Sequence, residues 1–276
     1  MVESIKIGNR VFDLRNKTYV MGILNVTPDS FSDGGLFNNI PAALRHVESM
    51  MRDGVDIIDI GGESTRPNHV KISDDEEIER VVPFINAIEK RFNIPISIDT
   101  YKAKVAKVAI ENGADLVNDI WGLKYDEALA NVIAESGVAY CLMHNRNDSN
   151  SYTNLVEDVL ADLRESVAIA DKAGISHDRI ILDPGVGFGK DTEQNLIITN
   201  NMDRLLKLGM PVLLGTSRKS MIGNTLHLPV GERVEGTIAT SVMAVMRGVS
   251  FVRVHDIKEN KRAIDMTRAI LDSGRY

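Results

Sequence analysis

Eight apolar runs recur along the chain, and each of them ends in polar or charged residues. The runs are rich in Val and Ile and alternate with longer segments of helical pattern. Such runs are typical of buried parallel strands in βα units. The predicted strands are Tyr19–Asn25, Asp56–Gly61, Pro95–Thr100, Asp115–Asp119, Val138–His144, Arg179–Asp183, Pro211–Ser217 and Ser250–Asp256. Eight such units within about 250 residues predict a (β/α)8 TIM barrel.

Glycine marks the carboxyl end of most predicted helices, where a residue in the left-handed conformation commonly stops the helix. These glycines are Gly54, Gly113, Gly137, Gly174, Gly209 and Gly248. The predicted helices are Ala42–Asp53, Lys102–Asn112, Asp126–Ser136, Asn154–Ala173, Thr192–Leu208, a helix that ends at Arg247, and Asn260–Leu271. Ahead of the first strand, Ile5–Leu14 holds two extended runs around Gly8-Asn9, which predicts a β-hairpin with a two-residue turn. We expect this hairpin to close the amino-terminal end of the barrel.

The composition fits one globular domain, and we expect a single domain over residues 1–276. The chain is 43% hydrophobic, and no Pro- or Ser-rich linker divides it. Its net charge of −7 argues against nucleic acid as a partner. The lone cysteine, Cys141, lies in an apolar run and excludes an internal disulfide. Since no segment has the pattern of a membrane span or a signal peptide, we expect a cytoplasmic protein without membrane contact.

In a TIM barrel the active site lies at the carboxyl ends of the strands. The candidate residues there are Asn25, Asp59, Asp99, Asn118, His144, Asp183, Lys219, Arg253 and His255. Two long polar segments, Pro28–Asn38 and Gly62–Ser73, follow the first two strands on the same face. Long loops in a compact domain are usually functional or disordered. On this face we favour function, and we expect both segments to be mobile in the empty protein.

Three of these candidates, Asp99, Asn118 and Asp183, provide two carboxylates and an amide to one cavity. This set suits a heterocycle with several N–H donors, such as an aminopyrimidinone, because one carboxylate can accept two donors at once. Structural roles are the alternative. Asp99-Thr100 could cap a helix, and Asn118-Asp119 could form a turn.

Cationic residues follow the last two strands. Ser217–Ser220 (SRKS) opens a helical turn, where cations oppose the helix dipole unless an anionic or electron-rich group offsets them. Arg253 and His255 share one face of the last strand and would suit a phosphate group. Solvated charges and a structural arginine are the alternatives. Gly185–Lys190 (GVGFGK) lacks the spacing of a nucleotide-binding loop, and we interpret it as a turn packed close to a ligand on Asp183.

Together these motifs resemble those of the dihydropteroate synthases, the folate-pathway enzymes that sulfonamides target. In the family's order they are Asn25–Gly35 (NVTPDSFSDGG), Gly61–Pro67 (GGESTRP), Ser97–Thr100 (SIDT), Asn118-Asp119, Asp183–Gly185 (DPG), Ser217–Ser220 and Arg253–His255 (RVH). The resemblance extends from about Val20 to the end of the chain. Two stretches depart from the family pattern: Asn68 stands where Gly is common, and His144–Tyr152 replaces a loop that usually contains Gly and Pro.

The resemblance implies a transferase that condenses (7,8-dihydropterin-6-yl)methyl diphosphate with 4-aminobenzoate, giving 7,8-dihydropteroate and diphosphate. It implies that the catalytic residues are Asp99, Lys219, Arg253 and His255. It also implies Mg2+ as the cofactor, with Asn25 as its protein ligand. The implied substrate-binding residues are Thr65, Arg66, Pro67, Asp99, Asn118, Met143, Asp183, Phe188, Lys219, Ser220, Arg253, Val254, His255, Phe31 and Asp33.

In this implied arrangement Asp183 and Asn118 bind the pterin ring, while Asp99 stabilises positive charge that develops on it. Arg253 and His255 bind the diphosphate. Lys219 reaches the carbonyl and N5 of the ring, and Met143 packs against the pterin. The 4-aminobenzoate pocket is formed by Ser220, Phe31, Asp33 and Pro67. The implied reaction is dissociative: diphosphate leaves first, and the aniline nitrogen then attacks a delocalised cation.

Other readings remain open from the sequence. A pterin-binding methyltransferase would share the Asp, Asn and Asp contacts but would have no use for a diphosphate clamp. A Schiff-base aldolase would use Lys219 as its nucleophile, and an inactive paralogue would only bind ligands. The family suggests a homodimer, for which the apolar positions of Ile238–Val249 could supply an interface.

Overall fold

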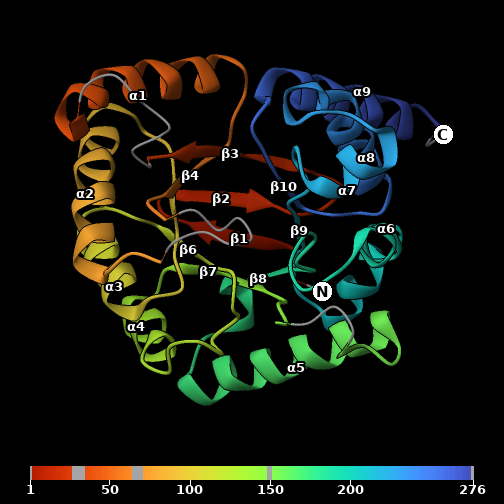
Figure 1. Ribbon diagram of the computed structural model, residues 1–276, viewed down its shortest axis with the longest axis horizontal. Helices are drawn as coiled ribbons and strands as arrows, with labels where there is room; N and C mark the ends of the chain where they lie inside the picture. Colours follow the sequence, from red (N-terminus) through yellow and green to blue (C-terminus); the bar gives the residue numbers. More distant parts are fainter. Residues whose placement is uncertain (1, 27–34, 64–70, 148–150, 275–276) are drawn as a thin grey trace.

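The computed structural model describes residues 2–26, 35–63, 71–147 and 151–274. Its central strands are β3 (Tyr19–Asn25), β4 (Ile57–Gly61), β5 (Ile96–Asp99), β6 (Leu116–Asp119), β7 (Ala139–Met143), β8 (Ile180–Asp183), β9 (Leu213–Leu214) and β10 (Phe251–Val254). They form one parallel sheet in the order β8-β7-β6-β5-β4-β3-β10-β9. A single parallel bridge between Leu182 and Val212 joins the two ends of this sheet. The predicted TIM barrel is therefore confirmed (Figure 1).

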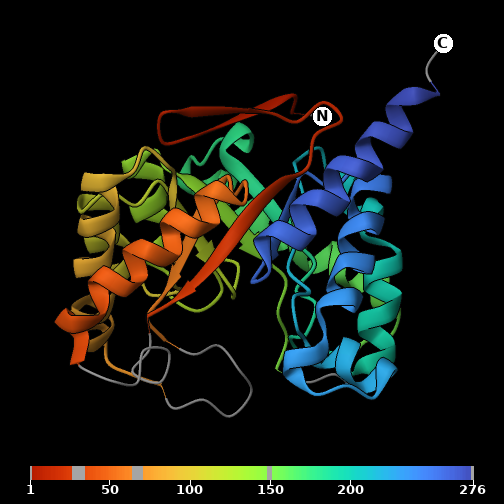
Figure 2. The same ribbon diagram turned by 90° about the horizontal axis from the view of Figure 1, so that it is seen from above.

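Helices surround the barrel between successive strands (Figures 1 and 2). They are α1 (Gly35–Arg52), α2 (Asp74–Arg91), α3 (Ala103–Glu111), α4 (Leu129–Ser136), α5 (Leu155–Ala173), α6 (Thr192–Asn200), α7 (Ser220–Leu226), α8 (Val234–Met246) and α9 (Ile257–Ser273). Each of the six glycines expected to end a helix has a positive φ, between 72° and 109°. Glycine adopts this conformation without the steric penalty of a Cβ, so these positions stop the helices as predicted.

Several boundaries differ from those predicted: α4 begins three residues later and α9 three residues earlier than expected, and three further differences concern α1, α6 and β9. α1 begins at Gly35, so the helix takes up the last residues of the predicted loop Pro28–Asn38. The predicted helix Thr192–Leu208 breaks at Asn201, whose side-chain amide donates to the Ile197 carbonyl, and it continues as a 3-10 helix. The third boundary is that of β9, which pairs over two residues only. The wider apolar run around β9 reflects burial rather than hydrogen bonding.

The pattern of apolar runs did not predict the ends of α2, although the sequence marks the residue at which this helix begins. The Ser73 hydroxyl accepts the backbone N–H of Glu76 at 3.2 Å, and four acidic residues fill the first turn. Both features stabilise a helix amino terminus. The Ser-x-x-Glu pattern was therefore the signal that hydrophobic periodicity alone did not supply.

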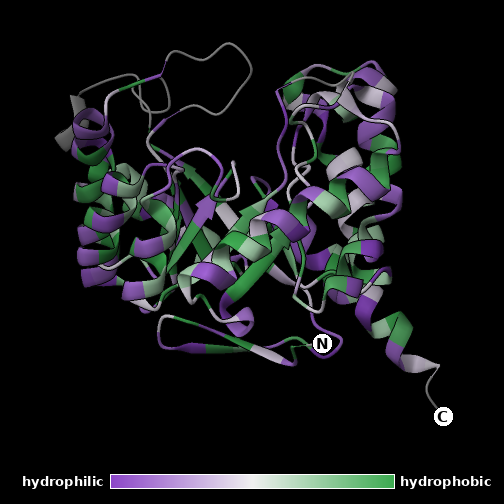
Figure 3. Cartoon of the chain, turned by 90° about the horizontal axis from the view of Figure 1, so that it is seen from below, coloured by the Kyte–Doolittle hydropathy of each residue, from purple (hydrophilic) through white to green (hydrophobic). Residues whose placement is uncertain are grey.

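The hairpin, β1 (Ser4–Ile7) and β2 (Arg10–Asp13), lies across the amino-terminal end of the barrel (Figure 2). Its two-residue turn has a positive φ of 60° at Gly8, as a primed turn requires. Apolar side chains of the hairpin pack with inward-facing strand residues in one buried cluster, which we call the plug. It consists of Ile5, Ile7, Phe12, Met21, Ile57, Leu116, Ala139, Cys141, Ile181, Leu213 and Phe251. The predicted closure of this end is confirmed, and Figure 3 shows the apolar interior against the more polar outer faces of the helices.

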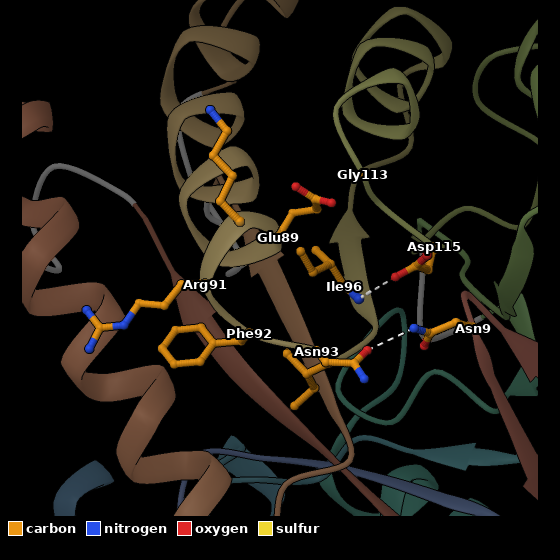
Figure 4. A pocket seen from close by; sticks show the side chains of 10 residues that line it. Asn9, Glu89, Arg91, Phe92, Asn93, Ile96, Gly113 and Asp115 are labelled. Carbon is orange, nitrogen blue, oxygen red and sulfur yellow. Dashed lines mark hydrogen bonds between the residues drawn. The ribbon is translucent and has the colours of Figure 1, made fainter.

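A polar hollow of about 460 Å³ lies beside the hairpin turn, at the amino-terminal ends of β5 and β6 (Figure 4). Asn9 donates to Asn93 across it at 2.8 Å, and the Ile96 N–H donates to Asp115 at 3.0 Å. The first bond ties the hairpin turn to the barrel, and the second joins the starts of β5 and β6, both at the end opposite the strand carboxyl ends. Among the described residues, no helix is both long and apolar enough to span a bilayer.

The hairpin should contribute measurably to stability through Phe12. Its ring is 3% exposed and meets Tyr19 edge-on, with centroids 4.8 Å apart. Phe12→Ala should lower the free energy of unfolding by about 3–5 kcal/mol in urea denaturation, because it opens a cavity in the plug. Val11→Ala, on the same strand but 69% exposed, is the control and should change it by less than about 0.5 kcal/mol. Equal effects of the two substitutions would contradict the stabilising role of Phe12 in the plug.

Candidate active site

The site is built by the alternation of side chains along the strands. Ile57 and Leu116 face the apolar plug, so the residues two positions later, Asp59 and Asn118, face the interior one layer higher. The intervening Ile58 and Val117 face the helices. The inward-facing positions of β4, β6, β8 and β10 thus change from apolar to polar as these strands approach the barrel mouth. The polar residues at the strand ends are consequently brought together, as the sequence predicts.

Arg253 lies between two carboxylates in this polar layer. Its Nε is 2.6 Å from Asp59 Oδ2, and its Nη2 is 2.6 Å from Asp99 Oδ2. Asp59 is fully buried, and Asn118 Nδ2 approaches the same Oδ2 at 3.4 Å. Charges in a dry interior require partners, and this arrangement supplies them across the barrel. Asp59 was a strand-end candidate without an assigned role. Its place here is to hold Arg253.

Asp99 therefore does not cap a helix. α3 begins without a side-chain cap at Lys102, and the Ala103 N–H instead donates to Asp126 at 2.8 Å. Burial raises the pKa of Asp99 to about 7; Arg253 opposes the rise, and the nearby Asp59 adds to it. Asp99 Oδ1 is buried and has no hydrogen-bond partner among the described residues. It is an acceptor suited to a donor on a ligand.

Asp183 and Lys219 face each other beside Gly215. A Cβ built on Gly215 would lie 3.7 Å from Asp183 Oδ2 and 3.9 Å from Lys219 Nζ, so the glycine keeps the space between them open. Asp183 Oδ1 accepts the Gly185 N–H at 2.7 Å. Burial raises the pKa of Asp183. Burial also lowers the pKa of Lys219 to about 8, while the Asp183 carboxylate opposes that change.

An apolar wall adjoins these charges. Met143 is buried in a small cluster with Tyr101 and Ile120, and Phe188 packs against it. The Lys219 ammonium lies 4.8 Å from the centre of the Phe188 ring and donates to the Val186 carbonyl. Polar groups at one edge and an apolar wall beside them are the usual features of a site for a flat heterocycle.

The cations after the last two strands have separate partners. Arg218 forms a two-fold contact with Asp256, at 3.0 and 2.5 Å, so a carboxylate of this chain offsets its charge. The Ser217 hydroxyl accepts the His255 backbone N–H at 3.1 Å and lies 3.0 Å from His255 Nδ1. If the hydroxyl donates to Nδ1, Nε2 carries the ring proton of a neutral His255. Ser220 is exposed at the start of α7.

Asn25 ends β3 as an exposed residue at the mouth. A Cβ built on Gly61 would lie 3.6 Å from Asn25 Oδ1 and 3.8 Å from Asp99 Oδ2, which places both oxygens at the same rim. In the part of the chain that the structure describes, no group of three or more His, Cys, Asp or Glu residues could hold a metal. Mg2+ often takes only one or two protein oxygens and completes its shell with water and phosphate, so this rim fits it.

Some predicted site residues lie elsewhere. The Val254 side chain is buried between the sheet and the helices, away from the mouth. Asp119 is a turn residue, as the structural alternative held: it accepts the N–H groups of Trp121 and Leu123 and the Tyr140 hydroxyl. The predicted loop residues Phe31, Asp33, Thr65, Arg66 and Pro67 lie outside the described residues.

A buried ion cluster beside the mouth was not predicted from the sequence. Lys102 Nζ is 2.7 Å from Glu63 Oε2 and 2.7 Å from Glu77 Oε2, and it also donates to the Ile72 carbonyl at 2.9 Å. The Ile72 N–H donates to Glu63 in turn. The cluster joins the end of β4 to the start of α2. A lysine directly after a strand end was its only sequence signal.

The pairing of Arg253 predicts a large stability effect at Asp59. Asp59→Asn should lower the free energy of unfolding by about 3 kcal/mol, because it leaves one side of a buried guanidinium without its carboxylate. Asp265→Asn removes an exposed partner of Lys261, 2.6 Å away, and should cost less than about 1 kcal/mol. Urea denaturation of both variants measures the contrast. A cost at Asp59 no larger than that at Asp265 would show that the buried pair is not needed.

Known proteins with similar sequences and structures identify the family of the chain. The family described as "pterin binding enzyme" matches residues 21–255. A dihydropteroate synthase of Clostridium beijerinckii is 59% identical over 268 residues, covering 97% of this chain and 99% of the relative. A crystal structure of the Clostridium difficile dihydropteroate synthase, determined with pteroic acid, has a TM-score of 0.90 and 48% identity over 96% of this chain and 98% of that one.

A second solved structure extends the comparison. The Xanthomonas albilineans dihydropteroate synthase with 4-aminobenzoic acid has a TM-score of 0.92 and 37% identity, covering 98% of this chain and 99% of that one. The fold, the order of the motifs and the sequence identity over nearly the full length of the chain all indicate the same family. The chain therefore belongs to the pterin-binding enzyme family and, within it, to the dihydropteroate synthases, which are transferases.

Proposed function

We propose that this chain joins a dihydropterin methyl diphosphate to 4-aminobenzoate by a dissociative reaction at the mouth of the barrel. The observation that carries this is the convergence of Asp183, Lys219 and Arg253 around Gly215, with an unpartnered Asp99 oxygen beside them. In our proposal Asp183 accepts the amino and ring N–H donors of the pterin. Asn118 binds the same ring, Lys219 donates to its carbonyl and N5, and Met143 and Phe188 cover its face.

The charges of the site suit a reaction that separates a cation from an anion. As the carbon–oxygen bond to diphosphate breaks, positive charge develops on the pterin and negative charge on the leaving group. Asp99 would stabilise the first through its unpartnered oxygen, and Arg253 and His255 would stabilise the second. Because these groups are already held by Asp59 and Ser217, they need not reorganise during the reaction. The electron pair of the broken bond leaves with the diphosphate.

The diphosphate would bind at the outer side of the mouth. Arg253 uses Nε and Nη2 for its two carboxylates, so we assign Nη1 to the diphosphate. We assign His255 Nε2 to the same anion, together with Thr65 and Arg66 from the second loop. Mg2+ would be held by Asn25 and would neutralise charge on the diphosphate. Phe31, Asp33, Pro67 and Ser220 complete the proposed 4-aminobenzoate pocket.

The alternatives are less well supported. A methyltransferase would need neither His255 nor an exposed Asn25 beside the pterin site. An aldolase would use Lys219 as an uncharged nucleophile, but here its ammonium has an acceptor in Val186 and a carboxylate in Asp183. The Val186 carbonyl and the Asp183 carboxylate both favour a charged Lys219 that donates hydrogen bonds.

We also propose that the enzyme is a homodimer through the face of α8 and α9. Met246, within the predicted segment Ile238–Val249, is 64% exposed, and Met266 and Ile270 of α9 are 61% and 58% exposed. The two helices pack against each other. Large apolar side chains exposed on adjacent helices favour coverage by a second copy.

The function is tested by incubating purified protein with the pterin diphosphate, Mg2+ and 4-aminobenzoate and measuring pteroate. We expect pteroate from the wild-type protein. Asp183→Asn should reduce the affinity for a pterin by up to ~10^4-fold in calorimetry, because its amide places a donor against donors on the ring. Asp178→Asn, in an exposed stretch ahead of β8, is the control and should bind normally. Failure of the wild type to make pteroate would overturn the function, and normal pterin binding by Asp183→Asn would overturn the assignment of Asp183.

The rate should also depend on pH in a defined way. Asp99, with its pKa raised to about 7, is charged above that pH, so kcat/KM should fall as the pH drops through 7. Lys219, with its pKa lowered to about 8, is charged below that pH, so kcat/KM should fall as the pH rises through 8. Lys219→Arg keeps a charge at all these pH values and should move the alkaline limb upward. A flat profile between about pH 6 and 9 would contradict these two roles.

A further inference from the structure

The glycine-rich segment Gly185–Lys190 ends in a lysine that the proposed reaction does not use. Lys190 Nζ lies 3.0 Å from the Gly185 carbonyl, 3.0 Å from the Phe188 carbonyl and 2.9 Å from His144 Nδ1. An ammonium group has three hydrogens to donate. Three acceptors therefore match it, and two of them belong to the turn that precedes the lysine.

A chain of side chains fixes the third acceptor. His144 Nε2 lies 3.0 Å from Asp162 Oδ2, and Arg146 holds the same carboxylate through Nε at 2.6 Å and Nη2 at 3.0 Å. With the ring proton on Nε2 facing the carboxylate, Nδ1 keeps its lone pair for Lys190. Burial and the neighbouring Lys190 lower the pKa of His144 to about 3, so the ring is neutral and can accept.

The turn itself packs directly on the backbone after β7. A Cβ on Gly185, where φ is +67°, would meet the His144 carbonyl oxygen at 1.8 Å. A Cβ on Gly189, where φ is +54°, would meet the Arg146 carbonyl oxygen at 2.1 Å. Only glycine fits this approach. The glycines allow the turn to lie against the backbone of His144 and Arg146, and Lys190 satisfies the carbonyl groups of Gly185 and Phe188.

The other side of the turn faces the pterin site. The Val186 carbonyl accepts from Lys219, the Phe188 ring lies beside the same ammonium, and the Gly185 N–H donates to Asp183. Two residues assigned to the pterin ring are thus oriented by this turn. They make no direct contact with Lys190 in the bonds described above.

We propose that Lys190 is a positioning residue for the pterin site. Its ammonium holds the Gly185–Gly189 turn in place by donating to two of its carbonyl groups, and this turn orients Lys219 and Asp183. The inference rests on the proposed function only in naming a pterin as the ligand. Burial lowers the pKa of Lys190 to about 7, and the Asp183 carboxylate opposes that change, so burial works against the ammonium form that donates to the three acceptors.

The test compares Lys190→Met, which keeps the length of the side chain but removes its charge and donors, with Lys190→Arg and with the exposed control Lys172→Met. For Lys190→Met we expect the KM for the pterin diphosphate and the Kd for 6-hydroxymethylpterin to rise by about 10-fold. The KM for 4-aminobenzoate should change much less. Lys190→Arg should recover part of the loss, and Lys172→Met should behave as wild type. A merely structural defect would lower the active fraction, and hence kcat, without this split between the two substrates.

Two outcomes overturn the proposal: folded Lys190→Met with wild-type pterin binding, or equal increases in both KM values. If Lys190→Met does not fold, Asp162→Asn carries the test, since it disturbs the orientation of His144 and should weaken pterin binding in the same direction. A wild-type protein that makes no pteroate would instead defeat the proposed function. In that case amide hydrogen exchange of Gly185, Gly187 and Phe188, which should quicken in Lys190→Met and much less in Lys190→Arg, decides without any substrate whether Lys190 holds the turn.

Discussion

The arrangement of the barrel mouth depends on one buried guanidinium. Arg253 stands between Asp59 and Asp99, so β10 is joined through side chains to β4 and β5 inside the barrel. Without this cation two carboxylates would face each other in an apolar enclosure, which is a costly arrangement. With it, each carboxylate has one oxygen paired with the guanidinium, while Asp59 Oδ1 and Asp99 Oδ1 are buried without a hydrogen-bond partner among the described residues. The same ion pairs thus stabilise the barrel and create an acceptor for a ligand.

The two ends of the barrel have different tasks. At the amino-terminal end the hairpin and the inward-facing apolar residues form a closed, well-packed plug. Two residues further along β4, β6, β8 and β10, the inward positions are polar. Stability at one end allows the other to hold several charged groups in a confined space. This separation is a general property of TIM barrels, and here it occurs within strands of at most seven residues.

Much of this could be predicted from the sequence because strand alternation and helix-ending glycines are local signals. The eight strands, the hairpin and the convergence of Asp99, Asn118 and Asp183 all followed from such signals. What could not be predicted depends on contacts between distant residues. The sequence shows that Arg253 ends a strand, but not that Asp59, 194 positions away, pairs with it. Likewise Lys102 and Lys190 look like surface lysines until the folded chain surrounds them with acceptors.

The short strand β9 has a consequence for how a ligand and the fold depend on each other. Between β8 and β9 the sheet is joined by one bridge, Leu182 to Val212, whereas β7 shares four residue pairs with each of its neighbours, β6 and β8. Asp183 lies at the end of β8, and Lys219 follows β9, so they stand on opposite sides of this seam. A molecule held by both would act as a cross-link where backbone hydrogen bonds are fewest. A ligand bound in the proposed way would therefore strengthen the closure of the barrel between β8 and β9, where the chain alone forms a single bridge.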